Sequence, residues 1–292
     1  MTRISLFLAS LAVAASARAW DTNAHKVIGV IAYRHLTPQA KAWADGLLKT
    51  LPNGFQDFLD AAPYPDYLKH GGPKDKPVVK RSRKYDGWHF IDYPVKEGQT
   101  LAFPTDESVE QNGNNALFGI AESVRQVTRG PEATRGLYLS LLLHIIGDVH
   151  QPLHCAERAD DKGGNAVALR GAIRNLHAYW DDAITVKYKL KGKSRGVSRA
   201  TDARIEEVAT SVESEFPLAK FGEEIAAKDP KAWAEESYAL AVDSAYDGLT
   251  PRTKPDAAYA NRWTIVAEGR VALAGYRLAD FLNRLVAGKV KA

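Results

Sequence analysis

Paired histidine and aspartate side chains stand one helical turn apart at two places in the chain. The stretch LLHIIGDVHQPLH, at residues 142–154, places His144 four residues before Asp148, and NLHAYWD places His177 four residues before Asp181. Residues at this spacing share one face of a helix. An imidazole and a carboxylate held in this way can bind one metal ion, and a ligand set without thiolates favours Zn²⁺ in a hydrolytic site.

The end of the first stretch brings a further histidine to the same place. Pro152 disfavours helix at Gln151, so we expect the helix to end near there. His154 then lies just past the helix end and can turn back towards the His–Asp pair. His150 points elsewhere on the helix, and we interpret it as supporting a ligand rather than as being one.

More side chains of ligand type lie upstream. They are His25, Asp66 in PYPDYLK and His89 in WHFIDYP. One His-x-x-x-Asp pair is more often a plain hydrogen-bonded pair than a metal site, so the interpretation rests on the whole set: five of the eight histidines fall in such contexts. His35 and His70 have no carboxylate at ligand spacing, and we expect surface or packing roles for both. Asp182, beside Asp181, is expected to face solvent.

The first nineteen residues, MTRISLFLASLAVAASARA, have the features of a signal peptide. Arg3 precedes an apolar run that is too short to span a membrane, and Ala17-Arg18-Ala19 fits the A-x-A cleavage rule. We predict removal of residues 1–19 and a periplasmic or secreted protein formed by one domain, residues 20–292; a membrane-anchored N-terminus is the alternative. Cleavage would free the amine of Trp20, which can chelate a metal together with its own carbonyl oxygen.

Composition and charge narrow the class of protein. The chain has 292 residues with 45% hydrophobic and 25% charged side chains, as in a soluble globular protein. Its formal charge is +4, and loss of Arg3 and Arg18 lowers it by two, to +2, which does not suit a nucleic-acid packaging protein. With Cys155 as the single cysteine, no intramolecular disulfide can form. The basic clusters at residues 74–84 and 187–195 are either solvated loops or surfaces that steer a polyanionic substrate.

Helical periodicity dominates the chain, and strand signals are few. Residues 52–112 are rich in glycine, proline and charge, so we expect long loops with short helical pieces there. These features predict one mainly α domain without repeats or linkers. The predicted helices span residues 23–36, 38–49, 113–129, 133–150, 175–188, 201–213, 215–227, 230–246 and 256–286.

Other hydrolase and metal-site plans fit poorly. The sequence has no H-E-x-x-H motif, which argues against a zincin protease, and no Glu-x-x-His pair, which argues against a ferritin-like di-iron site. It also lacks a G-x-S-x-G elbow and a phosphate-binding P-loop.

Six segments, taken in chain order, resemble the zinc-dependent S-one/P-one type nucleases, a family with fungal, plant and bacterial members that is distantly allied to zinc-dependent phospholipase C. They are Trp20 with His25, PYPDYLK, WHFIDYP, HIIGDVHQPLH, DKGGN and NLHAYWD. The resemblance covers essentially the whole mature chain. It implies a mainly α, single-domain, multi-helix phospholipase C/nuclease-type fold with long loops around a trinuclear zinc cleft. Fungal members carry disulfides that this chain cannot form, so bacterial members are the closer comparison.

The resemblance also implies three zinc ions per chain and a ligand set for each. The first zinc would be held by Asp66, His89, His144 and Asp148. The second would be held by the amine and carbonyl of Trp20, by His25 and by Asp148, which bridges the two ions. The third would be held by His154, His177 and Asp181.

The activity implied by the resemblance is hydrolysis of single-stranded DNA and RNA to 5′-phosphate products, together with removal of phosphate from 3′-nucleotides. Water activated by zinc would attack the phosphodiester, with Asp66, Asp148 and Lys69 as catalytic residues. No obligate protein partner is evident, and no membrane anchor remains after signal cleavage. Two alternatives stay open: a phospholipase C-like zinc phosphodiesterase on the same metal frame, and a non-catalytic, zinc-stabilised binding protein.

Three residues are candidates for substrate binding. In the family, positions matching Phe90 and Asp92 stack on a base and hydrogen-bond its edge, which requires an unpaired base; from the residue type alone, Phe90 is equally well explained as a core aromatic. Lys69 stands where relatives often carry arginine near the scissile phosphate, and lysine offers a point charge rather than a bidentate fork. For the DKGGN segment, Asp161–Asn165, the sequence does not indicate which part of the site it contacts.

Overall fold

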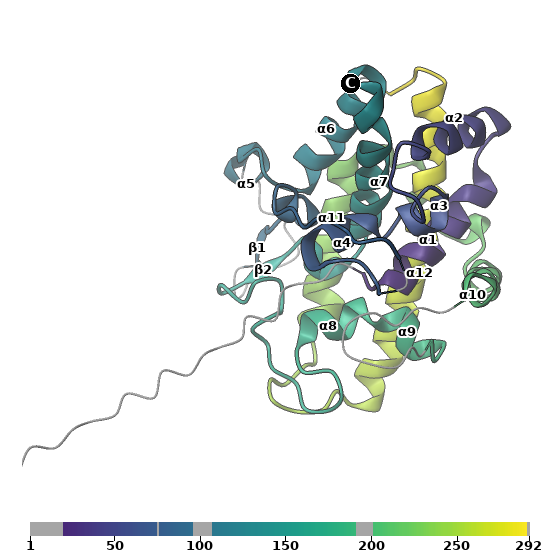
Figure 1. Cartoon of the computed structure of the whole chain (residues 1–292). Coiled ribbons are helices and arrows are strands. Elements are labelled where there is room, and N and C mark those ends of the chain that lie inside the picture. The colour runs from purple at the N-terminus through teal and green to yellow at the C-terminus, as the bar shows by residue number, and fades with distance from the viewer. Residues whose placement is uncertain (1–19, 75, 96–106, 191–200, 291–292) are drawn as a thin grey trace, which may run out of the picture.

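The computed structural model describes residues 20–74, 76–95, 107–190 and 201–290 (Figure 1). The described chain is mainly α-helical and folds around one hydrophobic core, as the sequence predicted. The predicted signal peptide, residues 1–19, lies outside the described residues. None of the helices in the described ranges combines the length and the apolar content needed to cross a bilayer.

Helices of ten or more residues build most of the domain. They are α1 (Thr22–His35), α2 (Pro38–Leu48), α6 (Ala116–Arg129), α7 (Glu132–Asp148), α10 (Asp202–Glu215), α11 (Pro230–Leu240) and α12 (Ala257–Val286). The shorter α-helices are α3 (Phe58–Ala61), α4 (Tyr64–His70), α5 (Glu107–Gln111), α8 (Leu176–Asp181) and α9 (Ala183–Lys187). Short 3₁₀ helices are η1 (Asp86–His89), η2 (Pro152–His154), η3 (Leu218–Phe221) and η4 (Glu224–Ala226). A π-helical turn, η5 (Ala241–Tyr246), follows α11, and the strands β1 (Pro94–Val95) and β2 (Glu157–Arg158) pair in parallel.

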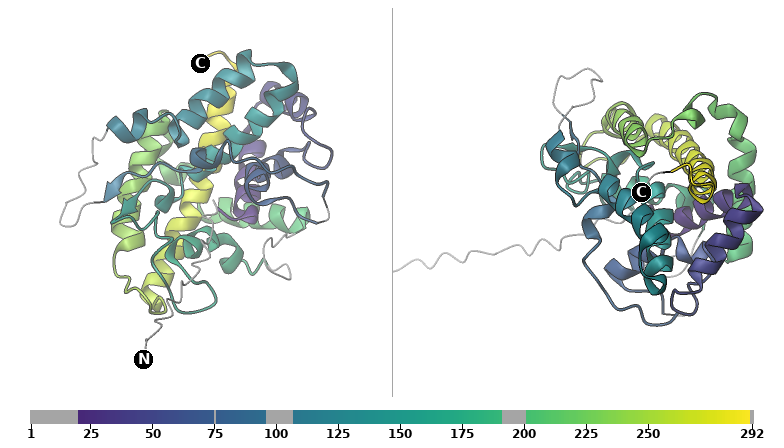
Figure 2. Two further views of the ribbon diagram at one scale, coloured as in Figure 1. Left: turned by 60° about the vertical axis from the view of Figure 1, so that its left-hand side comes forward. Right: turned by 90° about the horizontal axis from the view of Figure 1, so that it is seen from above.

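Helix α7 lies at the centre of the fold. Every residue from Tyr138 to Asp148 is buried, so this helix lacks the polar face of a surface helix. Helices α2, α4, α6 and α12 pack around it, together with η1. Figure 1 shows α7 (teal) beside α12 (yellow), and Figure 2 shows the same arrangement from two further sides. Side chains near the end of α7 are therefore shielded from water by neighbouring elements.

Local capping fixes where α1 begins. The Asp21 carboxylate accepts a hydrogen bond from the backbone N–H of Ala24, at 2.9 Å, and so satisfies one of the amides that have no partner in the first turn. Thr37 and Asn115 cap α2 and α6 in the same way. Because Asn115 takes the cap position, α6 begins at Ala116 rather than at residue 113.

Helices α1 and α12 approach closely at Gly275. A Cβ atom at this position would lie 2.6 Å from Cβ and Cγ2 of Ile31 and 3.2 Å from the carbonyl oxygen of Ile28. Glycine therefore allows the two backbones to approach closely, and α12 supports α1 from behind. His25 lies on the same helix, one to two turns before Ile31.

The predicted helix over residues 215–227 is wrong. The structure has two separate 3₁₀ helices there, η3 and η4. Pro217 stands immediately before η3 in extended backbone, with φ −64° and ψ 152°. Gly222 ends η3 with a positive φ of 47°, which an α-helix cannot continue through.

Two other predicted helices are divided. Residues 175–188 form α8 and α9, which meet at Asp182, where ψ is 6°. Residues 230–246 form α11 up to Leu240 and then the π-helical turn η5. The remaining predicted helices agree with the structure to within three residues at each end. Residues 52–112 contain short helices between loops, as expected, although residues 96–106 lie outside the described part.

We expect Gly275→Ala to lower the stability of the fold by about 1–3 kcal/mol, because the added methyl group overpacks the contact between α1 and α12. Thermal unfolding should show a melting temperature lower by several degrees. The control is Gly46→Ala on α2, where no atom lies within 4 Å of the new Cβ; it should be neutral or stabilise by up to about 1 kcal/mol through helix propensity. Equal melting temperatures for the two variants would contradict this description of the packing.

Candidate metal centre

Histidine and aspartate side chains gather in three buried groups, each with three ligand-type atoms within 4.8 Å of one another. The first group is His25, His144 and Asp148, the second is Asp66, His89 and His144, and the third is His154, His177 and Asp181. The groups share residues or adjoin one another, so they form one continuous cluster. All eight side chains predicted to be ligands lie in this cluster.

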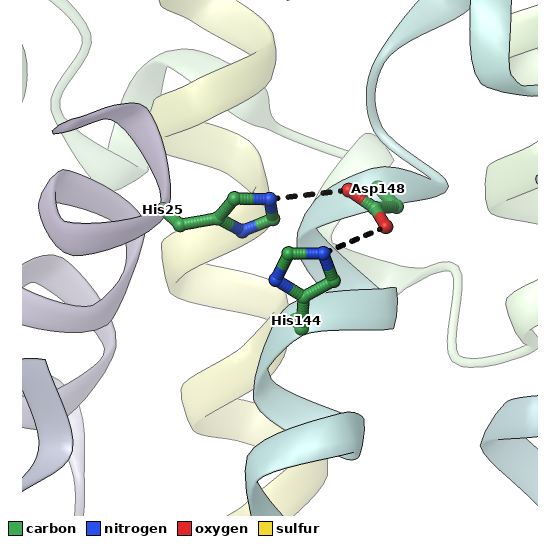
Figure 3. Close-up of side chains that lie close together, drawn as sticks. All are labelled: His25, His144 and Asp148. Carbon is green, nitrogen blue, oxygen red and sulfur yellow. Dashed lines mark ion pairs between the residues drawn. The ribbon is translucent and has the colours of Figure 1, made fainter. Parts of the chain in front are cut away.

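Asp148, the last residue of α7, is the centre of the cluster. Its Oδ1 lies 3.2 Å from Nε2 of His25, and its Oδ2 lies 3.3 Å from Nε2 of His144 and 3.0 Å from Nδ1 of His89. Figure 3 shows His25 reaching it from α1, while His144 reaches it from one turn earlier on α7. The rings of His25 and His144 stack with their centroids 3.7 Å apart. One carboxylate is thus shared by three imidazoles from three elements.

Asp66, on the short helix α4, completes the second group. Its Oδ1 lies 3.8 Å from Nε2 of His144 and 4.0 Å from Nδ1 of His89. The same two imidazoles face Asp148, and their facing nitrogens are 3.0 Å apart. Two carboxylates and two imidazoles from α4, η1 and α7 therefore converge on one small volume.

The third group lies beside the other two. His177 and Asp181 lie one turn apart on α8, with Nε2 and Oδ2 separated by 3.4 Å. His154, on η2, reaches the same carboxylate through Nε2, 3.7 Å from Oδ1. Its other ring nitrogen lies 3.9 Å from Oδ1 of Asp148, so this histidine stands between the third group and the rest.

Backbone carbonyls orient three of the histidines. In each, Nδ1 lies within hydrogen-bond distance of a carbonyl oxygen, which can only accept, so Nδ1 must carry the proton and Nε2 keeps its lone pair. That lone pair faces the carboxylates and is the form that binds a metal. The bonds run from His144 to Ala62, from His154 to His89 and from His177 to Gly163, at 2.8, 2.6 and 2.7 Å.

Burial makes the cluster electrostatically costly without a cation. Burial raises the pKa of Asp148 well above its usual value, and the nearby carboxylates of Asp66 and Asp181 raise it further. Burial also lowers the pKa of His25 well below its usual value and that of His144 to about 3, so these imidazoles stay neutral. Neutral rings cannot balance the carboxylates, whereas a divalent cation stabilises both kinds of group.

Several buried atoms of the cluster make no hydrogen bond to any residue in the described ranges. They are both ring nitrogens of His25, Oδ1 of Asp148 and Oδ2 of Asp181. A buried polar atom that makes no hydrogen bond costs free energy, so such atoms call for an explanation. These are the atoms that would coordinate metal ions, and nitrogen and carboxylate oxygen are ligands that zinc accepts.

Trp20 lies beside the first group. Its side chain is fully buried, and the indole N–H donates to the carbonyl oxygen of Gly147 at 3.0 Å. Gly147 precedes Asp148, and a Cβ atom on Gly147 would lie 3.1 Å from Nδ1 of His25. The Trp20 side chain is therefore fixed against the backbone of the residue that precedes Asp148.

Two residues that sequence reasoning missed hold the third group in place. Gln151 is fully buried, and its Nε2 donates to Oδ1 of Asp181 at 2.7 Å. Gly163, in the DKGGN segment, supplies the carbonyl that orients His177. A Cβ on Gly163 would lie 2.5 Å from the carbonyl oxygen of Leu153, which explains the glycine. Both residues stand in or beside the segments that carry the predicted ligands, which was a signal. Their contacts join positions 30 and 14 residues apart, however, and helical periodicity does not predict contacts at that separation.

The predicted substrate residues adjoin the cluster. Lys69 stands three residues after Asp66 on α4. Burial and the carboxylates of Asp66 and Asp181 raise the pKa of Asp148, and the positive charge of Lys69 opposes this effect. Phe90 and Asp92 are half-buried and follow His89 directly. Burial raises the pKa of Asp92 to about 7, with further contributions from the charges of Glu157 and Asp161.

The interpretation of His150 as a support for a ligand is not what its hydrogen bonds show. Its Nδ1 donates to the carbonyl oxygen of Ile146, and its Nε2 lies 3.1 Å from the guanidinium of Arg277 on α12. His150 thus belongs to the contact between the end of α7 and α12. Asp182 is half-buried rather than exposed, and its charge raises the pKa of Asp181.

Several side chains of the remaining histidines and of the basic clusters form ion pairs within the protein. His35 lies at the surface and pairs with Glu213 at 2.9 Å, and His70 is half-buried. In the first basic cluster, Lys76 pairs with Asp60 and Arg83 with Asp86. In the second, Lys187 pairs with glutamates, while residues 191–195 lie outside the described ranges. The steering of a polyanion by these clusters stays a prediction.

Comparison with known proteins shows that the chain is similar to nucleases. The family described as S1/P1 Nuclease matches residues 20–287. The chain is 26% identical to Nuclease S1 of Aspergillus oryzae over 289 residues, which cover 94% of each chain. It is also 26% identical to Endonuclease 4 of Arabidopsis thaliana over 283 residues, covering 93% of this chain and 91% of the relative. Endonuclease 2 of the same plant is 34% identical over 152 residues, about half of each chain.

We expect the protein to lose stability when a chelator removes divalent metal. A ligand present at a thousand times its dissociation constant stabilises a fold by about 4 kcal/mol, which corresponds to roughly 10 °C at this chain length. The ligands bind the metal in deprotonated form, so the melting temperatures of loaded and chelated protein should differ more at about pH 7.5 than at about pH 5.5. The raised pKa of Asp148 and of Asp181 has the same sign: the metal-free fold is penalised as pH rises and these carboxylates ionise.

Differential scanning fluorimetry checks this, with and without chelator at both pH values. Readdition of zinc in excess of the chelator is the control and should restore the original melting temperature. Identical unfolding curves with and without chelator would show that the cluster is a set of hydrogen-bonded side chains.

Proposed function

The chain belongs to the S1/P1 nuclease family, and on this premise we propose that it is an exported zinc-dependent endonuclease that cleaves single-stranded DNA and RNA to 5′-phosphate products and removes phosphate from 3′-nucleotides. Family membership supports a phosphodiester hydrolase. The observation that carries the finer proposal is the buried cluster of three histidine and aspartate groups around Asp148.

We assign three zinc ions to the cluster, following its three groups. Asp66, His89, His144 and Asp148 would hold one. Trp20, His25 and Asp148 would hold another, and His154, His177 and Asp181 would hold the third. Zinc bound there supplies Lewis acidity, which lowers the pKa of water and offsets negative charge at a phosphate. These ligand sets need no thiolate. The single thiol, that of Cys155, is buried and donates to the carbonyl oxygen of Val149.

The chain's own residues then position and neutralise the substrate. Lys69 would pair with the scissile phosphate, because it lies in the last turn of α4, three residues after the candidate ligand Asp66. Asp66 and Asp148 hold the ligand set in place from two different helices. Both residues are buried, with side chains at most 10% exposed, which limits competition from bulk water.

Phe90 and Asp92 are proposed to bind a base. They follow the ligand His89 along the chain, so a base that contacts them lies next to the cluster. A ring that stacks on Phe90 while its edge meets Asp92 must be unpaired, which would explain a preference for single strands. A carboxyl with its pKa raised to about 7 can donate or accept a hydrogen bond near neutral pH.

Export and signal removal belong to the same proposal. If residues 1–19 are cleaved, Trp20 gains a free amine beside His25, and this amine is proposed as a zinc ligand. The burial of the Trp20 side chain and its indole bond to Gly147 support a fixed position for that terminus.

The first test compares substrates. The mature protein should digest denatured DNA faster than duplex DNA and should release phosphate from 3′-nucleotides. Asp148→Asn should lower kcat by a thousandfold or more, since it removes the charge shared by the ligand groups. The control is Asp243→Asn, the same chemical change at an exposed position of η5, which should retain full activity.

Two outcomes would contradict the proposal. Hydrolysis of phosphatidylcholine without cleavage of denatured DNA would make the protein a phospholipase C-like enzyme. Stoichiometric zinc in a protein that hydrolyses neither substrate would make it a zinc-stabilised binding protein.

The second test concerns the N-terminus. Protein that begins at Trp20 should bind three zinc ions, whereas protein with one additional alanine before Trp20 should bind fewer and lose most of its activity, because the amine is displaced from the cluster. Native mass spectrometry gives the zinc count, and the circular dichroism spectra of the two proteins serve as the control for folding. Full zinc content and full activity in the extended protein would exclude the terminal amine as a ligand.

A further inference from the structure

Asp21, the residue next to Trp20, links the start of α1 to the pair of helices α8 and α9. We infer that Asp21 and Thr185 form a positioning contact that fixes the N-terminal zinc ligands relative to the third group, an inference that rests on the proposed role of the Trp20 amine. The contact would act through geometry, because neither residue belongs to a predicted ligand set.

Three hydrogen bonds define the contact. The backbone N–H of Asp21 donates to the carbonyl oxygen of Asp181 at 3.2 Å. The Thr185 hydroxyl donates to Oδ2 of the Asp21 carboxylate. Asn23 then donates from its side-chain amide to the Thr185 oxygen at 2.7 Å. The start of α1 is thereby joined to the end of α8 and to α9.

The two ends of this contact are covalently next to ligands of different groups. On one side, Asp21 stands between Trp20 and His25, and its own carbonyl oxygen accepts the N–H of His25 at 3.1 Å. On the other side, Asp181 carries the third group's carboxylate and Thr185 lies one turn further along. A shift of α1 relative to α8 would therefore change the distance between the first and third groups.

Helix capping accounts for only one of the two oxygens of the Asp21 carboxylate. Its Oδ1 caps α1 through the N–H of Ala24, as an asparagine or serine would also do. Its Oδ2 bonds outside the helix, to Thr185 on α9. Asp256 at the start of α12 provides the contrast, because its carboxylate caps through the N–H of Tyr259 and stands at an exposed position.

This division gives a matched pair of variants. Asp21→Ser keeps a capping oxygen but is too short to reach Thr185, while Asp256→Ser makes the same change at a cap outside the metal cluster. Thr185→Val removes the hydroxyl from the opposite side of the contact and leaves the cap of α1 intact. The mature protein beginning at Trp20 carries each change.

The measurement is zinc affinity by competition with a chromophoric chelator, together with the zinc count from native mass spectrometry. Mutation of residues that orient ligands typically lowers metal affinity by about 10–100-fold. Asp21→Ser and Thr185→Val should therefore each lower the affinity for one of the three zinc ions by about tenfold or more. The double variant should be no weaker than the worse single variant, because both remove one interaction. Asp256→Ser should leave all three affinities unchanged.

The outcomes separate this inference from the proposed function. Wild-type protein that binds no zinc would overturn the proposed function itself. Wild-type protein that binds three zinc ions while Asp21→Ser and Thr185→Val bind them equally well would overturn only the positioning contact. A melting temperature of the metal-free variants close to that of metal-free wild type shows that the loss of zinc is not a loss of fold; additive effects in the double variant would count against a shared contact.

Discussion

The buried carboxylate of Asp148 is the constraint on which the rest of the structure depends. It is fully buried and lies within 3.3 Å of nitrogens from three imidazoles. Those imidazoles are held neutral by burial, so they offer hydrogen bonds or lone pairs but no compensating charge. A divalent cation would supply the compensating charge that this buried carboxylate lacks. The surrounding elements α1, α4 and η1 each bring a side chain of ligand type to the end of α7.

The orientation of the histidines shows how loops take part in a helical site. A ring nitrogen that donates to a fixed carbonyl leaves the other nitrogen with one possible direction. For His177 that carbonyl belongs to Gly163, in a loop with positive φ at Gly163 and Gly164. The loop thus orients a candidate ligand through its backbone. A connection between helices here supplies the backbone oxygen that fixes the ring of His177.

Helical periodicity predicted the two same-face pairs, and the structure places their atoms 3.3 and 3.4 Å apart. It could not group the pairs with Asp66 or His25, because Asp66 lies 78 residues before His144 and His25 lies 123 residues before Asp148; that grouping came from the family resemblance. Gln151 and Asp21 were missed for a related reason, since each looks like an ordinary turn or cap residue until the opposing element is known. The prediction of one helix over residues 215–227 was wrong because it gave too little weight to the helix-breaking residues Pro217 and Gly222.

Ligands from different helices can share one ion only if the helix backbones come close together. Bulky residues would keep α1 and α7 apart, yet the rings of His25 and His144 stack at 3.7 Å. Gly147 makes this possible, because any side chain there would meet the His25 ring. Gly275 has the same effect on the opposite side of α1, where α12 packs. Gly147 therefore leaves room for the ring of His25 against α7, and Gly275 lets the helix that carries His25 pack closely on α12.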